Sequence, residues 1–190
     1  MTSSRNKAAA GSLAFDPPLT IGVIADTHVY AHGARRLAAD VLDLFVRFEV
    51  GLILHAGDIN TASVLRTLER IAPTLAVRGN NEESELQDTL PAVRPFRIGA
   101  HTFVLLHGDG DRTARTAARR YAGRVDCIVY GHSHIPRIDL ENDTILFNPG
   151  SATDRRWQPY FGIGLIRVTT TRIDPELVLF DDPRHLLTVT

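Results

Sequence analysis

Short polar motifs rich in Asp and His follow apolar runs along the chain, and their side chains are of the kinds that bind divalent metals. Asp26 and His28 follow one apolar run, and Asp58 follows another. Asn80 and His107 stand at corresponding positions after two later runs. Carboxylate, amide and imidazole groups supply the oxygen and nitrogen ligands suited to Mn, Fe or Zn. The motifs therefore indicate a metal centre.

Each motif taken singly is weak evidence for such a centre. An Asp after Gly is often a turn former or a helix cap, and a pair such as His132 and His134 on a loop is often only solvated. The joint arrangement is stronger evidence, because ligands in open α/β sheets bind in a crevice at the carboxyl ends of the strands. Without a metal, so many polar groups in one crevice would compete for scarce hydrogen-bond partners.

The apolar runs that precede the motifs have the length of buried strands. They cover residues 20–25, 51–56, 74–77, 101–106 and 126–130. Apolar residues at helical spacing predict helices over 34–48, 61–72 and 113–122, and strand patterns return over 135–147, 161–168 and 172–180, with a turn at 141–143. Strands that alternate with helices predict an α/β fold.

Length and composition describe one soluble globular domain. The chain has 190 residues, of which 44% are hydrophobic and 23% charged, and its formal net charge of -1 gives no bulk attraction to nucleic acid or anionic membrane. No apolar stretch is long enough to span a bilayer. Cys127 is the single cysteine, which excludes an internal disulfide and favours a reducing, cytoplasmic compartment.

The domain is expected to cover residues 19–190. Residues 1–18 are expected to form a disordered tail, in which Gly11 and Ser12 interrupt a stretch that loosely imitates a signal peptide. The prolines at 17 and 18 block a helix and mark the start of the folded part.

In their order and spacing, the motifs resemble those of the calcineurin-like metallophosphoesterase superfamily, in particular its small bacterial and archaeal phosphodiesterase branch, which also resembles Vps29. They are Asp26-Thr27-His28, Gly57-Asp58, Gly79-Asn80-Asn81-Glu82, His107-Gly108, Gly131-His132-Ser133-His134 and Asn148-Pro149-Gly150-Ser151. The resemblance covers nearly the whole folded chain. It implies a sandwich of two mixed β-sheets flanked by helices, in four layers αββα.

The resemblance also implies a ligand set for two divalent ions. It assigns Asp26, His28 and His134 to one metal, Asn80, His107 and His132 to the other, and Asp58 as the bridging carboxylate. Asp58, Asn80 and His107 are thereby the expected catalytic residues, and Mn is favoured over Fe, Zn or Ni. Two such ions about 3.5 to 4 Å apart can clamp phosphate oxygens and generate a hydroxide near neutral pH. The expected reaction is hydrolysis of a small phosphodiester by a hydroxide that bridges the metals.

Two positions depart from the family pattern. Asn81 stands where several branches have a His that helps the leaving group, so monoesters with basic leaving groups are less favoured. Asp109 stands where many small members have a second imidazole. Asp109 and Glu82 are candidates to accept hydrogen bonds from the free nitrogens of the ligating imidazoles.

Residues at the rim could bind substrate. The amide nitrogen of Asn80 could donate to a phosphate, and Arg155 and Arg156 either reach that phosphate or are solvated. Trp157, with Tyr160, either stacks on a nucleobase or covers the core. The arginines between 112 and 120 are interpreted as a solvated helix face.

The expected partner is a small phosphate ester, with nucleotide-derived esters among the candidates, and the sequence gives no membrane signal and no strong nucleic-acid signal. Three other functions stay open: a noncatalytic Vps29-like interaction module, a phosphomonoesterase and a nuclease. The nuclease ranks last, because the chain lacks a strongly basic groove. Nothing in the sequence indicates an oligomeric state.

Overall fold

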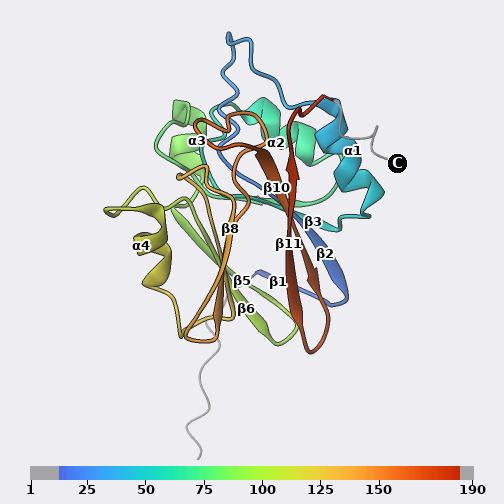
Figure 1. The fold of residues 1–190 in the computed structure, drawn as a ribbon, viewed down its shortest axis with the longest axis vertical. Helices are drawn as coiled ribbons and strands as arrows, with labels where there is room; N and C mark the ends of the chain where they lie inside the picture. Colours follow the sequence, from blue (N-terminus) through green and yellow to red (C-terminus); the bar gives the residue numbers. More distant parts are fainter. Residues whose placement is uncertain (1–12, 185–190) are drawn as a thin grey trace, which may run out of the picture.

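Two mixed β-sheets face each other at the centre of the computed structural model, which describes residues 13–184 (Figure 1). The five-stranded sheet has the order β11-β10-β2-β3-β4, with β2 at Leu19–Ile24, β3 at Leu52–His55, β4 at Thr74–Ala76, β10 at Phe161–Val168 and β11 at Ile173–Phe180. The six-stranded sheet has the order β1-β5-β6-β7-β9-β8, with β1 at Leu13–Phe15, β5 at Val93–Ile98, β6 at His101–Leu106, β7 at Cys127–Tyr130, β8 at Arg137–Glu141 and β9 at Thr144–Asn148. In the first sheet β2, β3 and β4 are parallel, as are β6, β7 and β9 in the second.

Helices cover the outer faces of both sheets. They are α1 at Ala39–Arg47, α2 at Ala62–Leu68, α3 at Ser84–Thr89 and α4 at Ala114–Arg119. Buried residues of α1, α2 and α3 share one apolar cluster with the five-stranded sheet, and those of α4 share another with the six-stranded sheet. Figure 1 shows the first three helices along the upper part of the view and α4 at its left. The predicted four-layer αββα sandwich is confirmed.

Strand β2 illustrates how the sequence builds these layers. Successive side chains of a strand point to opposite faces, so Ile21 and Val23 pack between the sheets while Ile24 packs under the helices. Gly22 also faces the helices, and a Cβ atom at that position would lie 2.8 Å from the ring of Phe45 in α1. The glycine therefore lets α1 lie close against the sheet.

A strand lies before the predicted boundary at residue 18. Leu13–Phe15 forms β1, which pairs in parallel with β5 at the edge of the six-stranded sheet. Phe15 packs edge-on against Phe96, and this apolar contact explains why a segment interpreted as a tail is a strand. Residues 1–12 of the predicted tail and 185–190 of the predicted domain lie outside the described residues.

Besides β1, two elements were absent from the sequence-based expectations, because their local pattern is weak. Helix α3 is mostly polar, and β5 contains Pro95 and two arginines, Arg94 and Arg97. The helix expected over 34–48 begins only at Ala39, and the segment from 25 to 38 is a long loop, which rises in blue at the top of Figure 1. No helix among residues 13–184 is long and apolar enough to cross a membrane.

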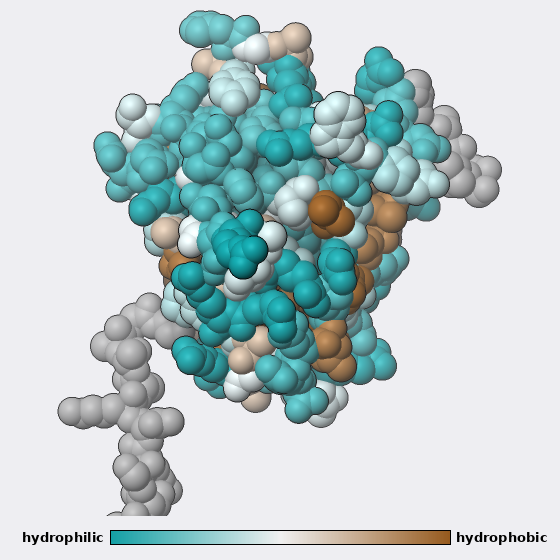
Figure 2. Space-filling model, turned by 60° about the vertical axis from the view of Figure 1, so that its left-hand side comes forward, coloured by the Kyte–Doolittle hydropathy of each residue, from teal (hydrophilic) through white to brown (hydrophobic). Residues whose placement is uncertain are grey.

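The arginines of α4 are paired across the surface. Arg115 and Arg119 form ion pairs with Asp139 and Glu141 of β8, and Arg120 pairs with Asp111. These side chains stay 38 to 64% exposed, so the interpretation of the helix as a solvated face agrees with the structure, which adds surface ion pairs to it. Figure 2 shows that the face turned forward from this side is mostly hydrophilic, with scattered hydrophobic residues.

Candidate metal centre

The motif residues gather at the carboxyl ends of strands from both sheets. Asp26 and His28 follow β2, Asp58 follows β3 and Asn80 follows β4, whereas His107 follows β6 and His132 and His134 follow β7. A crevice at the end of one open sheet was the expectation from the strand pattern, and that part is wrong. The two sheets end side by side, and each supplies part of the cluster.

The backbone at this cluster is held in an unusual conformation. The left-handed region is adopted by Asp26 (φ 52°), His28 (φ 46°), Asp58 (φ 55°), His132 (φ 66°) and His134 (φ 57°). Each such residue costs roughly 1 to 2 kcal/mol relative to ordinary backbone. Conformations of this kind persist only where surrounding contacts enforce them, and they concentrate at functional sites.

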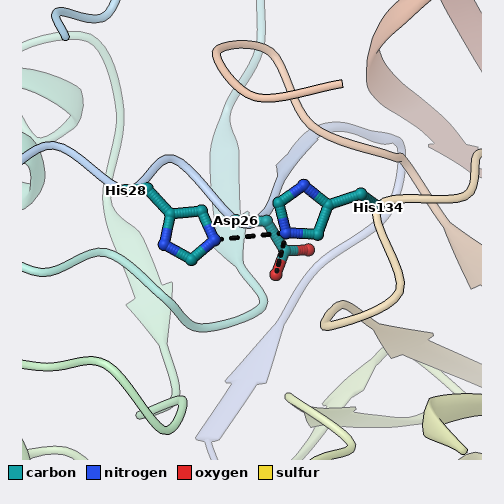
Figure 3. Close-up of side chains that lie close together, drawn as sticks. All are labelled: Asp26, His28 and His134. Atoms are coloured by element: carbon teal, nitrogen blue, oxygen red, sulfur yellow. Dashed lines mark hydrogen bonds and ion pairs between the residues drawn. The ribbon is translucent and has the colours of Figure 1, made fainter. Parts of the chain in front are cut away.

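We call Asp26, His28 and His134 group one; one ligand atom from each lies within 4.8 Å of the others. The two imidazoles stack with ring centroids 5.1 Å apart, and their Nε2 atoms approach to 3.1 Å (Figure 3). His134 Nε2 lies 3.6 Å from Asp26 Oδ1. Asp26 Oδ2 is buried and has no hydrogen-bond partner among residues 13–184.

Burial sets the charges of group one. It raises the pKa of Asp26 to about 8, lowers the pKa of His134 to about 4 and also lowers the pKa of His28. Both imidazoles are therefore neutral at pH 7. The unpartnered oxygen of Asp26 and the facing imidazole nitrogens make a donor set that fits a first-row divalent cation.

We call Asp58, His107 and His132 group two; its ligand atoms also lie within 4.8 Å of one another. His107 Nε2 lies 3.3 Å from Asp58 Oδ1 and 3.2 Å from His132 Nδ1. The amide oxygen of Asn80 is 3.2 Å from the same nitrogen, so Asn80 stands beside group two. The side chains thus fall into two clusters, with Asn80 beside the second.

The carboxylate of Asp58, a member of group two, also faces group one. Its Oδ1 is 3.3 Å from His107 Nε2, and its Oδ2 is 3.5 Å from His28 Nε2. Oδ1 also accepts hydrogen bonds from the backbone amides of Asn80 and Asn81, and Oδ2 accepts one of 2.7 Å from the Asn81 side chain. Gly79 makes this packing feasible, since a Cβ atom there would collide with the Asp58 carboxylate.

Asp58 and His107 form an ion pair in the absence of metal. Burial alone would raise the pKa of Asp58, but hydrogen bonds from His107 and Asn81 and the His107 charge hold that pKa well below its usual range. Burial alone would lower the pKa of His107, but the hydrogen bond to Asp58 and the charges of Asp26 and Asp58 raise it to about 9. In group two, Asp58 and His107 thus carry opposite charges, whereas the side chains of group one are mostly uncharged.

Backbone carbonyls orient two of the candidate ligand imidazoles. His107 Nδ1 lies 2.8 Å from the carbonyl of Ala56, and His134 Nδ1 is hydrogen-bonded to the carbonyl of Asp154. Each carbonyl requires the proton to be on Nδ1, which leaves Nε2 to face the group. Sequence analysis missed both acceptors, because every residue has a carbonyl and no side chain marks these two.

The side chains proposed for that orienting role do something else. Glu82 accepts hydrogen bonds from the backbone amides of Ile59, Asn60 and Gly79, so it fixes the loops around Asp58. Asp109 is exposed and, among residues 13–184, accepts no hydrogen bond from an imidazole. The prediction that Glu82 and Asp109 orient the ligands is therefore wrong.

The two rim arginines differ in their surroundings. Arg155 donates to the carbonyls of Gln158 and Pro159 and stands over the ring of Phe161. Arg156 is exposed, and its positive charge lowers the pKa of Asp26 and of the histidines of group one. Trp157 exposes 96% of its surface, so its interpretation as a cover for the core is wrong.

Comparison with known proteins places the chain among phosphoesterases. Residues 19–171 match the calcineurin-like phosphoesterase superfamily domain. A "probable metallophosphoesterase" of Methanothermobacter thermautotrophicus is 35% identical over 164 residues, which cover 84% of this chain and 92% of that protein. A phosphodiesterase of Methanocaldococcus jannaschii is 25% identical over 144 residues, covering 70% and 83%. The crystal structure of Vps29 from Chaetomium thermophilum has the same fold, with a TM-score of 0.70 and 20% identity over 87% of this chain and all (100%) of that one. The motifs, the sandwich and these matches agree: the chain belongs to the calcineurin-like phosphoesterase superfamily.

Proposed function

We propose that the chain is a hydrolase that cleaves a small phosphodiester at a centre of two divalent metal ions. Family membership supports the reaction class. The observation that carries the binuclear part is the position of Asp58, whose oxygens lie 3.3 Å from His107 of group two and 3.5 Å from His28 of group one. A carboxylate at that place is able to bridge two cations.

Groups one and two would each hold one ion. Asn80 stands beside group two, and Asp58 of group two also faces group one through its Oδ2 atom. The bound ions would supply positive charge for the phosphate oxygens and acidity for a water molecule near neutral pH. Manganese is our first choice, with iron, zinc or nickel as alternatives, because Asp, Asn and His donors accept all of them.

The chain's own residues then act around that centre. His107 is fixed by the Ala56 carbonyl, so its Nε2 keeps facing group two. Asn80 is exposed, and with its oxygen turned to His107 its amide nitrogen is free to donate to a phosphate oxygen. Arg156 adds positive charge at the rim, where it would attract and hold the anionic ester.

The identity of residue 81 supports a diester substrate. Asn81 carries no titratable proton, and its amide nitrogen already donates to Asp58 Oδ2 at 2.7 Å. A monoester with a basic leaving group needs a proton donor near the departing oxygen. Asn81 is unable to supply that proton, so monoesters should be the poorer substrates.

A nucleotide-derived diester is the substrate class that we favour within this proposal. Trp157 is 96% exposed on the loop that carries Arg156, and Tyr160 on the same loop is 45% exposed. Aromatic faces of this kind stack on nucleobases, while an arginine beside them meets the phosphate.

The test uses metal-stripped protein reloaded with manganese and a chromogenic aryl phosphodiester, beside the matching monoester. We expect manganese-dependent turnover of the diester, slower turnover of the monoester, and loss of both in Asp58→Asn. An active Asp58→Asn would refute the bridging role. A faster monoester would make the chain a phosphomonoesterase.

A second candidate function is that of a noncatalytic, Vps29-like module that binds a partner chain. The exposed Trp157 favours it, because such side chains often anchor protein interfaces. Silence with manganese, iron, zinc and nickel alike would support this candidate over hydrolysis.

A further inference from the structure

Two loops meet beside group one. Residues 25–38 join β2 to α1 and carry His28; we call them the ligand loop. Residues 149–160 join β9 to β10, and we call them the support loop. Ser151 of the support loop donates to the carbonyl of Asp26 at 2.7 Å, and Thr153 donates to the carbonyl of Thr27 at 2.6 Å. The position of the ligand loop therefore depends on the support loop.

Arg35 of the ligand loop contacts both the backbone of its own loop and a side chain of the support loop. Its Nη1 donates to the carbonyl of His28 at 3.4 Å, and its Nη2 lies 3.2 Å from Asp154 Oδ2. Asp154 in turn offers its backbone carbonyl to His134 Nδ1. One guanidinium thus touches the backbone of one imidazole ligand and the residue that orients the other.

The ion pair is unsuited to a general stabilising role. The side chains of Arg35 and Asp154 are 36% and 24% exposed, and ion pairs with this access to water contribute little to global stability. The planar guanidinium has donors in fixed directions, so it is able to hold two acceptors at a set separation. The geometry points to an effect on the orientation of group one.

We propose that Arg35 is a positioning residue that clamps the ligand loop to the support loop and thereby presents His28 and His134 to a divalent cation. Loss of a residue that orients metal ligands typically weakens metal binding by about 10 to 100-fold. We expect a loss of that size at group one and none at group two, which Arg35 does not touch. The proposal rests on the proposed function only in requiring that group one binds a divalent ion.

The test follows each imidazole of the full-length chain by long-range ¹H–¹⁵N NMR during titration with Zn²⁺, and it measures affinities by calorimetry. In Arg35→Gln, the signals of His28 and His134 should need about 10 to 100-fold more Zn²⁺ to reach the bound position. The signals of His107 and His132 should respond as in the wild type. Arg35→Lys keeps the charge and should recover part of the loss.

Arg36→Gln is the matched control, because Arg36 lies in the same loop and, within residues 13–184, donates only to the carbonyls of Gly33 and Arg35 in that loop. It removes the same charge without opening the clamp, so we expect wild-type affinities. Asp154→Asn keeps the backbone carbonyl but removes the ion pair. Combined with Arg35→Gln, it should add little further loss, since both changes break one contact.

The outcomes separate the clamp from the proposed function. Equal weakening at both groups in Arg35→Gln, or affinities equal to those of Arg36→Gln, would overturn the clamp. A wild type that binds zinc at group one but hydrolyses no ester under any metal would overturn the proposed function and leave the clamp in place. A wild type whose His28 and His134 do not respond to Zn²⁺ would overturn both.

Discussion

Group one and group two contain similar side chains but differ in protonation: the side chains of group one are mostly uncharged, whereas group two contains an ion pair. In group one the pKa of Asp26 is raised to about 8 and the pKa of His134 is lowered to about 4, so the group is close to neutral at pH 7. In group two His107 and Asp58 form an ion pair, with the pKa of His107 raised to about 9. Burial sets the direction of the pKa shifts in the first group, whereas for Asp58 and His107 of the second group hydrogen bonds and charges together outweigh it.

The two groups also differ in what holds them. Group two is fastened at strand ends, where the Ala56 carbonyl fixes His107 and the amides of Asn80 and Asn81 fix Asp58. Group one depends on two long loops that meet through Ser151 and Arg35. We infer that group two is largely formed before metal binds, whereas group one depends more on its supports.

Asp58→Asn should have the largest effect, because it is the change that reaches both groups. An amide has nearly the same shape, but it lacks the second anionic oxygen needed between two cations. We expect turnover to fall by about 10³-fold or more while far-ultraviolet circular dichroism stays unchanged. Asp109→Asn, on the exposed residue after the His107 motif, should keep wild-type turnover; an equal loss there would show that the assay responds to charge alone.

Metal binding should release protons, and the number released tests the contrast between the groups. In the metal-free chain Asp26 and His107 have pKa values of about 8 and about 9, so both hold a proton at pH 7, whereas His28 and His134 are neutral. A cation at group one requires Asp26 to lose its proton, and a cation at group two requires His107 to lose its proton, so the affinity of each group should rise by up to about 10-fold from pH 7 to 8.

Calorimetry at pH 7 in buffers of different ionisation enthalpy counts these protons. We expect about two protons for the wild type and about one for Asp26→Asn, since only His107 then releases one.

The free energy of unfolding of the metal-free chain should fall as the pH rises, whereas the metal affinity should rise. The folded pKa of Asp26 lies above its ordinary value of 3.8, so its stabilising contribution is present below that value and is lost as the pH rises through 8. No proton release at pH 7 would contradict these charge states.

Asn81→Ala should weaken group one more than group two, because the hydrogen bond that it removes holds Asp58 Oδ2, the oxygen that faces His28. It removes the hydrogen bond of 2.7 Å from the Asn81 side chain to Asp58 Oδ2 but leaves the backbone amide in place. Loss of a residue that orients a ligand costs about 10 to 100-fold in metal affinity. Equal weakening of His28 and His107 signals in a zinc titration would show instead that the two groups respond as one unit.

Arg156→Ala should give the smallest effect, confined to substrate binding. We expect KM for the anionic diester to rise several-fold with kcat nearly unchanged, and the difference from wild type to shrink at high salt because the arginine is exposed. Arg155→Ala is the control, since Arg155 is engaged with carbonyls of its own loop. A similar rise of KM in both variants would remove any special role for Arg156.

Much of the fold and of the site was predictable because the relevant patterns are local. Apolar runs followed by Asp or His predicted strands that end in polar side chains, and the structure brings those side chains into two clusters. Helical spacing predicted α1, α2 and α4, although α1 begins later than expected. Helix α3 and strand β5 were missed, because Ser84–Thr89 is polar and Pro95 interrupts the strand pattern.

The sequence by itself determined which side chains are able to bind metal, since their types and their positions at strand ends are written in it. Only the tertiary structure decided that two sheets share the site, that Asp58 lies between the groups, and that Arg35 meets Asp154. It also placed the carbonyls of Ala56 and Asp154 against the imidazoles. The physical reason is that local patterns report how a segment buries its own side chains. Contacts between distant segments, and hydrogen bonds to backbone groups that every residue carries, leave no mark in the order of residues.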